Sequence, residues 1–473
     1  MPLPTIPSGN VASATAGGFS VANSCRFNDG DSAELSISPS SSSNRKTWTL
    51  SMWVKRCTLG QYYTLWRANG SGIDDYFSFQ NDDTLDWSFN SDGGFISTNR
   101  KFRDVGAWFH FVLRMDSTNA TAGDRQRLYV NGVEETSFST DTQVSQDTDG
   151  NTNNSAATHR IGASASSQYF DGYIAEVVLL DGISAAPTEF GEFDEDSPTI
   201  WKPKDVSGLT FGTNGFYLDF EDSSNLGNNA GSGSSDFSES NLAAVDQATD
   251  TPTNSFCTLN SLVPARNFRI PQSGAAFSEG NCKFATSNGS SDWGSAMGTI
   301  GLTAGKWYAE CKLQATSNNA VIGLKGTHET SADKFFGETT GDYSYYATDG
   351  DYYPGVGAAS GVSYGDSYTT NDIIGVYVDL DNNKLYFAKN GTVQNSGTGI
   401  SITDPASVNF GLYVLGCQEW NSGGDGTFEW NFGGCPAFTI SSGNADANGY
   451  GNFEYAVPSG FYALCTKNLA EYG

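Results

Sequence analysis

The stretch at residues 371–391, NDIIGVYVDLDNNKLYFAKNG, constrains the possible folds of this chain most strongly. Val376 and Val378 share one face of an extended segment, and Leu385 and Phe387 share one face of the next. Such alternation is typical of strands that turn one face toward a core. The Asn, Asp and Gly residues around the two runs tolerate the positive φ that tight turns need. The stretch therefore predicts an antiparallel β-hairpin.

The same pattern occurs earlier in the chain. Residues 108–116, WFHFVLRMD, alternate in the same way, and RLYVNGV follows at 127–133. The segment TWTLSMWVKR at 47–56 alternates as well. We therefore expect an all-β protein with two β-sandwiches in tandem.

Composition agrees with this fold class and excludes several partners. The chain has 473 residues, with 55 Gly, 14 Pro and 13% aromatic residues, as in a turn-rich β protein. Its 25 basic and 53 acidic residues give a formal charge of −28. Because such a surface repels phosphates and anionic lipids, we expect neither nucleic-acid binding nor membrane insertion. The N-terminal sequence MPLPTIPSGN lacks the basic region and apolar core of a signal peptide, so we expect synthesis in a cytoplasm.

Shifts in composition and patterning divide the chain into segments. The first twenty residues are rich in Pro, Ala, Ser and Gly, and the stretch NLGNNAGSGSSDFSESN at 225–241 has no periodicity. We expect local opening to be easiest around that second stretch. The predicted segments are an extended N-terminal docking arm (1–20), a first sandwich (21–190), an acidic Gly/Ser/Asn-rich connector (191–267), a second sandwich (268–436) and a C-terminal appendix that packs on it (437–473).

Metal and thiol chemistry have little support in the sequence. The eight cysteines are scattered without a C-x-x-C motif, so we expect reduced thiols and no cofactor. Residues 379–384, DLDNNK, begin like a calcium loop, but Asn390 stands where such a loop needs a bidentate Glu. A hairpin turn explains the segment better. A weak calcium site made by rim carboxylates, with ligands that the sequence does not identify, stays open.

Catalytic residues are equally hard to find. Glu192, Asp194 and Asp196 lie on one face of an extended segment, as a pair of glycosidase carboxylates would. They fall outside the predicted sheets, however, and Pro198 follows directly. We expect a solvated acidic loop there and no enzymatic activity.

The candidate ligand site is the tyrosine-rich loop at 342–368. Tyrosine offers a flat face for stacking on a sugar ring and a hydroxyl group for hydrogen bonding. An alternative is that some of these tyrosines belong to the core of the second sandwich. The candidate ligand-binding residues are Tyr345, Tyr346, Tyr352, Tyr353, Tyr364 and, on another predicted rim loop, Trp420.

Both sandwiches resemble known families. The first, with WFHFVLRMD and RLYVNG, is similar to laminin-G and concanavalin-A-like lectin domains. The second resembles a SPRY domain through GKWYAEC at 305–311, AVIGL at 320–324, the hairpin at 371–391 and FEWNFGG at 428–434. These resemblances imply two concanavalin-A-like sandwiches of the jelly-roll type.

Further segments resemble structural proteins of tailed bacteriophages, notably those of marine bacteria. They lie at 171–204, 214–230, 246–260, 431–434 and 457–473. The resemblance implies a virion protein, either a fibre or adhesin or a capsid-decorating component, that displays lectin-like modules to a host-surface glycan. It further implies a homo-oligomer on the particle that contacts other virion proteins through the arm. A polysaccharide depolymerase and a purely architectural cement protein remain alternatives, and a peptide-binding adaptor is a weaker one.

Overall fold

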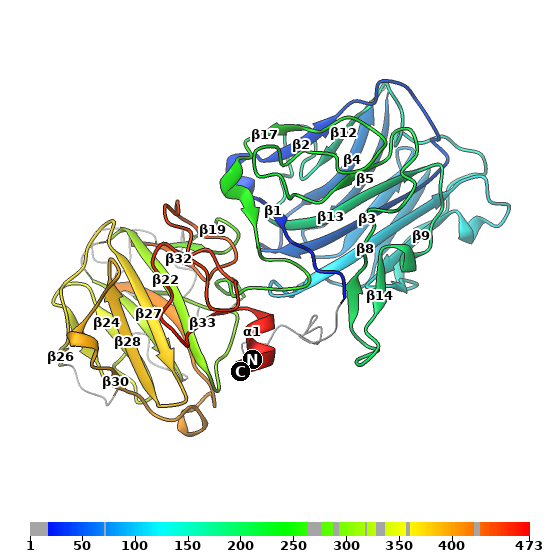
Figure 1. Cartoon of the computed structure of the whole chain (residues 1–473). Coiled ribbons are helices and arrows are strands. Elements are labelled where there is room, and N and C mark those ends of the chain that lie inside the picture. The colour runs from blue at the N-terminus through cyan, green and yellow to red at the C-terminus, as the bar shows by residue number, and fades with distance from the viewer. Residues whose placement is uncertain are drawn as a thin grey trace. The chain divides into compact units, whose positions relative to one another are not determined.

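The computed structural model describes residues 18–70, 72–262, 276–286, 293–316, 319–327, 336–355, 360–420 and 426–473. The predicted docking arm lies outside these residues except at 18–20. The chain divides into two compact units, Gly9–Asn254 and Ser255–Gly473, and Figure 1 shows both with many of their strands labelled. Each unit is a two-layered β structure, so the prediction of an all-β protein with two sandwiches is confirmed.

The first unit packs two antiparallel sheets face to face. Within the described residues, sheet 1 has the order β10-β9-β8-β3-β13-β1-β18, with β16 paired to β13, and sheet 2 has the order β11-β7-β6-β5-β4-β12-β2-β17. The strands of sheet 1 are β1 (Ser24–Phe27), β3 (Thr47–Arg56), β8 (Trp108–Asp116), β9 (Gln126–Val130), β10 (Val133–Glu134), β13 (Gly172–Asp181), β16 (Phe216–Leu218) and β18 (Gln247–Ala248). Those of sheet 2 are β2 (Glu34–Ile37), β4 (Tyr63–Gly70), β5 (Ile73–Phe79), β6 (Leu85–Phe89), β7 (Gly94–Thr98), β11 (Phe138–Thr142), β12 (Thr158–Ile161) and β17 (Ser238–Ser240).

Alternation along the strands builds the core between the two sheets. Leu50, Met52 and Val54 of β3 turn inward to meet Phe77 and Phe79 of β5, and all five are buried. The burial of each such side chain contributes about 1.5–3 kcal/mol. The alternation that predicted the sandwich is therefore the pattern that fills it.

The stretch 191–254, predicted as part of a connector, belongs to the first unit. The hairpin β14 (Gly191–Phe193) and β15 (Trp201–Pro203) is followed by β16, β17 and β18, which pair with β13, β2 and β1. A buried ion pair between Lys55 Nζ and Asp250 Oδ2, 2.7 Å apart, holds the end of the stretch. The polar composition of 191–254 concealed short strands and buried anchors, and the boundary between the units falls at residue 254 instead.

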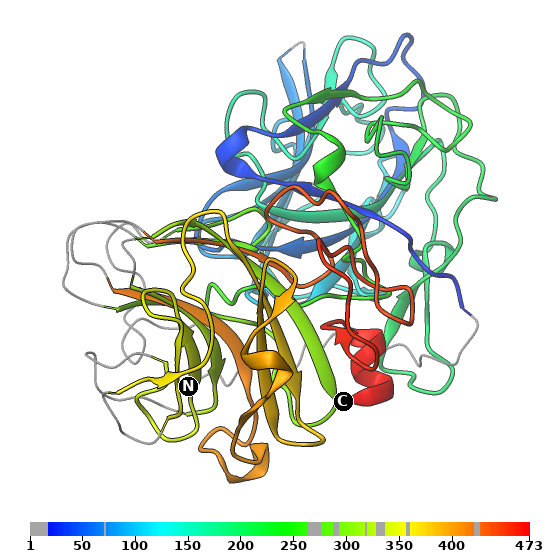
Figure 2. The same ribbon diagram turned by 60° about the vertical axis from the view of Figure 1, so that its left-hand side comes forward.

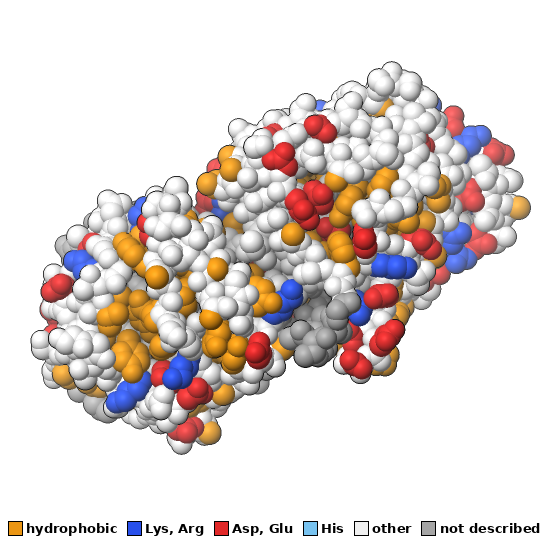
Figure 3. All heavy atoms as spheres, in the orientation of Figure 1, with side chains coloured by type: hydrophobic (Ala, Val, Ile, Leu, Met, Phe, Trp, Pro, Cys, Tyr) orange, Lys and Arg blue, Asp and Glu red, His pale blue; other side chains and the backbone are white. Residues whose placement is uncertain are grey.

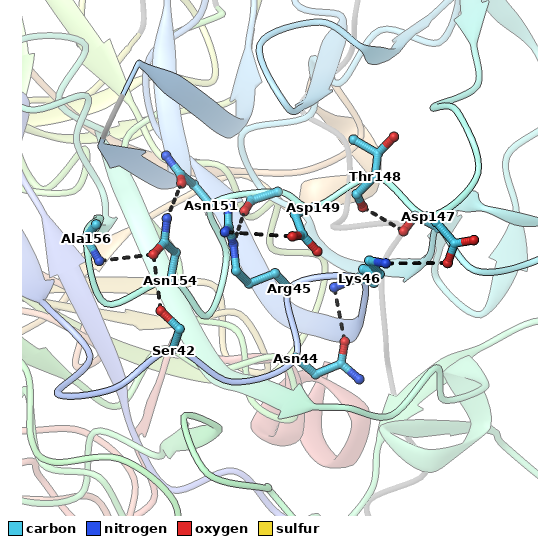
Figure 4. Close-up of polar contacts among 12 residues, drawn as sticks. Ser42, Asn44, Arg45, Lys46, Asp147, Thr148, Asp149, Asn151, Asn154 and Ala156 are labelled. Carbon is cyan, nitrogen blue, oxygen red and sulfur yellow. Dashed lines mark hydrogen bonds and ion pairs between the residues drawn. The ribbon is translucent and has the colours of Figure 1, made fainter.

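A polar segment at 141–154 is fixed at one rim of this unit. Its sequence alone indicates only a loop. The carboxylate of Asp75 accepts backbone hydrogen bonds from Asn151 at 2.6 Å and Thr152 at 2.8 Å. Figure 4 shows the neighbouring contacts, in which Arg45 Nε donates to the carbonyl of residue 150 at 2.6 Å and Asn154 Nδ2 donates to Asn151 Oδ1 at 2.7 Å. The segment is held by these buried hydrogen bonds together with Val144, which packs in the core of the first unit.

The second unit repeats the two-layer plan. Within the described residues, sheet 3 has the order β19-β20-β32-β22-β27-β28-β29, with β30 beside β28 and β33 beside β22, and sheet 4 has the order β21-β31-β23-β24-β25-β26. The strands of sheet 3 are β19 (Ala276–Ser278), β20 (Lys283–Ala285), β22 (Lys306–Ala315), β27 (Ile373–Asp379), β28 (Lys384–Lys389), β29 (Thr392–Val393), β30 (Ile400–Ser401), β32 (Thr427–Asn431) and β33 (Tyr462–Ala463). Those of sheet 4 are β21 (Trp293–Met297), β23 (Ala320–Lys325), β24 (Tyr343–Tyr346), β25 (Asp351–Tyr353), β26 (Val362–Ser363) and β31 (Val414–Trp420).

The C-terminal appendix covers the outer face of sheet 3. The buried carboxylate of Glu310 on β22 accepts the backbone N–H groups of Glu454 at 2.9 Å and Tyr455 at 2.8 Å. Phe453 packs its ring edge on Tyr308, with centroids 5.0 Å apart. The chain closes with α1 (Thr466–Tyr472), red in Figures 1 and 2.

Helical structure is otherwise limited to short 3₁₀ turns within the described residues. These are η1 (Asp29–Asp31), η2 (Ala122–Asp124), η3 (Pro187–Glu189), η4 (Ala244–Asp246), η5 (Asn395–Gly397) and η6 (Pro405–Ser407). In the part of the chain that the structure describes, no helix has the length and apolar character needed to cross a bilayer.

Candidate functional site

A polar pocket of about 270 Å³ opens on the outer face of sheet 2 in the first unit. Phe77 and Phe79 of β5 point into the core, so the residues between them and before them, Tyr76 and Ser78, point outward. The pocket is lined by Tyr62, Thr64, Arg67, Asp74, Tyr76, Ser78, Gln80, Ser164 and Gln168.

An irregularity in β4 shapes this pocket. The register between β4 and β5 shifts between Thr64 and Trp66, as in a β-bulge. Because of the extra residue, Leu65 and Trp66 both lie in the core, while Thr64 lines the pocket. Bulges re-aim side chains in this way next to many binding sites.

A bidentate ion pair forms one wall. Arg67 Nε lies 2.8 Å from Asp74 Oδ1, and Arg67 Nη2 lies 2.6 Å from Asp74 Oδ2. Arg67 Nη1 also donates to Ser164 Oγ. The guanidinium is therefore held in one orientation, and its charge is balanced by the carboxylate.

A chain of neutral polar groups forms the opposite wall. Ser78 Oγ donates to Thr64 Oγ1 at 3.2 Å, and Thr64 Oγ1 donates to Gln168 Oε1 at 3.0 Å. The backbone N–H of Thr64 also donates to the carbonyl of Gln168 at 2.9 Å. These contacts fix the position of the Gln168 amide, whose side chain is exposed at the mouth.

Two tyrosines give the pocket its aromatic surface. Tyr62 is 46% exposed, so much of its ring is accessible to a ligand. Tyr76 is half-buried, and burial, with Asp92, Asp86 and Asp74 nearby, raises its pKa to about 12. Its hydroxyl group, which is hydrogen-bonded to the Asp92 side chain, is therefore protonated at neutral pH.

The pocket combines exposed aromatic rings with donors and acceptors in fixed positions. A sugar ring has the complementary surface, with apolar C–H faces and hydroxyl groups at its edge. The volume lies just under the range of about 300–1,000 Å³ typical of drug-sized ligands, so one sugar ring fits better than an extended chain.

Two of the candidate residues predicted from sequence are core residues. Tyr345 and Tyr364 are buried between sheets 3 and 4, where the Tyr345 ring packs on Phe387 with centroids 5.2 Å apart. The Tyr364 hydroxyl accepts the backbone N–H of Phe387 at 3.0 Å. A ligand therefore has no access to either ring, and the predicted binding role is corrected for both.

The other four candidates remain half-exposed. Tyr346 and Tyr353 contact each other edge to face, with centroids 5.7 Å apart, and Trp420 contacts Trp293 in the same manner at 5.6 Å. Tyr346, Trp293 and Trp420 belong to one apolar cluster on the outer face of sheet 4. Tyr352 packs instead against the core of the second unit.

The acidic residues of the hairpin β14–β15 have structural roles. Glu192 and Asp194 share Lys202, whose Nζ lies 3.5 and 3.4 Å from their carboxylates. Asp194 also accepts the backbone N–H groups of Asp196 and Ser197, which closes the turn. Among the described residues, no three His, Cys, Asp or Glu side chains gather as metal ligands.

The sequence analysis did not predict the residues that line the sheet 2 pocket, although the alternation of β5 is visible in the sequence. In residues 73–79, IDDYFSF, the outward positions are polar or amphipathic and the inward ones include two phenylalanines. That alternation identifies the outward face of β5. The bulge at Thr64 and the approach of residues 164 and 168 are tertiary features that no local pattern encodes.

Comparison with known proteins identifies both domains. Residues 29–184 match the concanavalin A-like lectin/glucanases superfamily, and residues 306–429 match the SPRY domain. The chain therefore carries a concanavalin A-like domain followed by a SPRY domain. Ran-binding protein 9 from Danio rerio is 29% identical over 106 residues, which are 22% of this chain and 17% of that protein. The Homo sapiens protein of that name is also 29% identical over 106 residues, 22% of this chain and 14% of its own length, so the match spans less than a fifth of either relative.

Solved structures with similarity include the SPRY domain of human HERC1. The two are 16% identical in sequence, the match covers 31% of this chain and 86% of the HERC1 chain, and the TM-score is 0.25. A heptameric SAP-like pentraxin from Limulus polyphemus is 13% identical in sequence. The match covers 34% of this chain and 78% of the pentraxin chain, and the TM-score is 0.27.

Proposed function

We propose that this chain binds a host-surface saccharide through the pocket on sheet 2, as a structural attachment protein of a bacteriophage particle. The observation that supports this most is the pairing of the exposed Tyr62 ring with the fixed Arg67–Asp74 pair in one pocket. The description of the matching superfamily names lectins and glucanases, which both take saccharides, and so agrees with this ligand class.

The preferred ligand is a neutral saccharide. The Arg67 charge is balanced by Asp74, so the pocket offers no free cation to an acidic sugar. The chain as a whole carries a formal charge of −28, which repels polyanions at a distance. Neutral hydroxyl groups, in contrast, can exchange hydrogen bonds with Gln80, Gln168 and Tyr76 at the pocket surface.

The virion setting rests on the phage-like segments at 171–204, 214–230, 246–260, 431–434 and 457–473. In this setting, other virion proteins hold the chain through residues 1–20, and many copies face outward as a homo-oligomer. One small pocket binds weakly, but many copies on one particle multiply the attachment. Deleting residues 1–20 should leave both units folded and remove the chain from assembled particles.

A glycan microarray probed with the purified full chain tests the ligand class. We expect neutral glycans to be retained and sulfated or uronic-acid glycans to be rejected. Tyr62→Ala removes an exposed ring, so it should remove retention while leaving the unfolding transition unchanged. Retention of acidic glycans alone would contradict the proposed specificity, and an array without any retained glycan would favour the purely architectural alternative.

A depolymerase is the second candidate, because one carboxylate at the same face has the properties of a general acid. Asp86 lies on β6, paired with Ser78 of the pocket, and it is half-buried. Burial raises its pKa above the ordinary value; a hydrogen bond with Ser97 opposes this shift, and Asp82 and Asp92 add to it. We propose that the protein is nevertheless a binder, since Asp74, the pocket carboxylate, is occupied by Arg67. New reducing ends from a retained glycan that disappear in Asp86→Asn would establish the enzyme instead.

A further inference from the structure

Three tyrosines form a ladder across the outer face of sheet 3. Tyr308, Tyr377 and Tyr386 are directly opposite one another on β22, β27 and β28. Their exposure rises along the ladder: Tyr308 is fully buried under Phe453, Tyr377 is 4% exposed, and Tyr386 is half-buried. The appendix thus covers one end of the ladder and leaves the other end accessible.

A pocket of about 220 Å³ lies where the covering ends. Its floor is formed by Tyr377 and Tyr386 and one wall by Phe461, which meets Tyr377 edge to face with centroids 5.8 Å apart. Figure 3 shows hydrophobic side chains gathered on this face of the second unit, over β27 and β28. The full lining is Tyr377, Asp379, Tyr386, Val393, Gly397, Pro458 and Phe461.

The pocket walls are firmly held, so the pocket is formed before any ligand arrives. Glu310 fixes the appendix at residues 454 and 455, and Asp446 accepts the N–H of Ala463 at 2.9 Å and the amide of Asn468 at 2.7 Å. Asp379 is engaged by Lys306 Nζ at 3.0 Å and by Asn382. With its carboxylate paired, the pocket selects for apolar and not for cationic groups.

Grooves lined by aromatic rings are the usual docking sites of proline-rich segments, because a polyproline II helix is extended and loses little entropy on binding. The chain contains such a segment. Three of its 14 prolines are Pro2, Pro4 and Pro7, and PTIP at 4–7 has P-x-x-P spacing. Since a polyproline II helix has three residues per turn, Pro4 and Pro7 share one face.

We propose that residues 2–7 of this chain dock in the pocket between the tyrosine ladder and the appendix, with Pro4 and Pro7 against Tyr386 and Phe461. The segment has no charged side chain, which agrees with a pocket whose carboxylate is already paired. Ten residues separate Pro7 from Gly18, the first described residue, so at about 3.1 Å per residue the segment can reach well beyond its point of attachment. The docking needs no saccharide and goes beyond the proposed attachment function, because it concerns the free chain, in which no other virion protein holds residues 1–20.

Photo-crosslinking in the full chain tests the proposal. Thr5 lies between the two prolines and is replaced by p-benzoylphenylalanine, and the crosslinked peptides are mapped by mass spectrometry. We expect attachment within β28, β29 or residues 455–461. Val393→Asp should lower the yield about ten-fold, because the new carboxylate would be buried without a partner. Pro4→Ser combined with Pro7→Ser should lower it as well.

Val362→Asp is the matched control. Val393 and Val362 are both exposed strand residues of the second unit, at 40% and 43%, but Val362 lies on sheet 4 outside the pocket. Its replacement should leave the yield unchanged. Crosslinks that map elsewhere, or a yield that falls equally in both variants, would overturn the proposal. Glycan retention by Val393→Asp tests the sheet 2 pocket separately. A failure of saccharide binding can therefore be distinguished from a failure of the docking proposal.

Discussion

Trp201 Nε1 donates a hydrogen bond to His110 Nδ1 at 2.9 Å, and this contact holds the hairpin β14–β15 on the outer face of sheet 1. His110 also lies 2.8 Å from Ser51 Oγ through Nε2 and stacks on Trp53 with centroids 4.6 Å apart. Burial lowers the pKa of His110 to about 3, so the ring is neutral. Because Nδ1 accepts from the indole, Nε2 carries the proton and donates to Ser51. The alternation on β8 turns His110 away from the core between the two sheets, and the hairpin β14–β15 buries it there.

Removing the indole should destabilise the first unit. Trp201→Ala leaves a cavity and removes the hydrogen-bond donor of His110 Nδ1, so we expect a loss of about 3–5 kcal/mol in the free energy of unfolding. The measurement is denaturant unfolding of the full chain, in which only the transition of the first unit should move. Phe193→Ala is the control: its ring meets Trp201 at 4.9 Å, but it is 42% exposed and should cost much less. Equal losses in both variants would show that Trp201 has no special role.

Residues 225–250 should resist proteolysis. Their low periodicity predicts easy opening, but the structure holds them by β17, by β18 and by Asp250, which is paired with Lys55 and accepts Trp108 Nε1 at 3.0 Å. We expect limited proteolysis to leave this stretch intact in the native chain. Lys55→Met leaves the buried Asp250 carboxylate without its ion-pair partner, at a cost of about 3–5 kcal/mol, and should expose residues 225–250 to cleavage. Cleavage between 225 and 250 at the same rate in both chains would contradict this anchoring.

The stability of the first unit should decrease from pH 5 to pH 8 through Glu176. Burial raises the pKa of this carboxyl group to about 8, and the Tyr217 hydroxyl donates to it at 2.8 Å. Between its ordinary pKa and about 8, the folded chain keeps the proton that the unfolded chain releases. Rising pH therefore favours unfolding, by up to about 1.4 kcal/mol per pH unit.

Glu176→Gln removes this titration and keeps an acceptor for Tyr217. Unfolding at several pH values should give a flatter profile for the variant than for the parent chain. Parallel profiles would mean that Glu176 is ionised in the folded protein.

All eight cysteines should be reduced and slow to react. Their side chains are buried, and burial raises the pKa of Cys417 to about 12 and that of Cys311 well above its ordinary value. Alkylation should therefore be slow in the native chain and should label eight thiols after denaturation without reductant. A protected pair after denaturation, for instance Cys417 with Cys435, would refute the expectation of reduced thiols.

The fold could be predicted from the sequence because the alternation of apolar and polar residues along a strand is a local pattern. The hairpin β27–β28 and the strands β3 and β8 lie where the alternating runs place them. The site was less readable, because burial in the second unit depends on partners far away in the chain. Tyr345 and Tyr346 are neighbours on β24, yet one faces the core and the other the outer surface. The bulge at Thr64 and the reach of Gln168 over β4 likewise depend on tertiary contacts.

Calorimetric titration of a neutral glycan retained on the array tests the central claim most directly. Tyr62 and Val133 are both exposed apolar side chains of the first unit, at 46% and 59%, but only Tyr62 lines the pocket. We predict binding by the parent chain and by Val133→Ala, and a loss of about 1–3 kcal/mol in Tyr62→Ala, comparable to the loss of one stacking ring. Unchanged binding by Tyr62→Ala would contradict the assignment of the saccharide to this pocket.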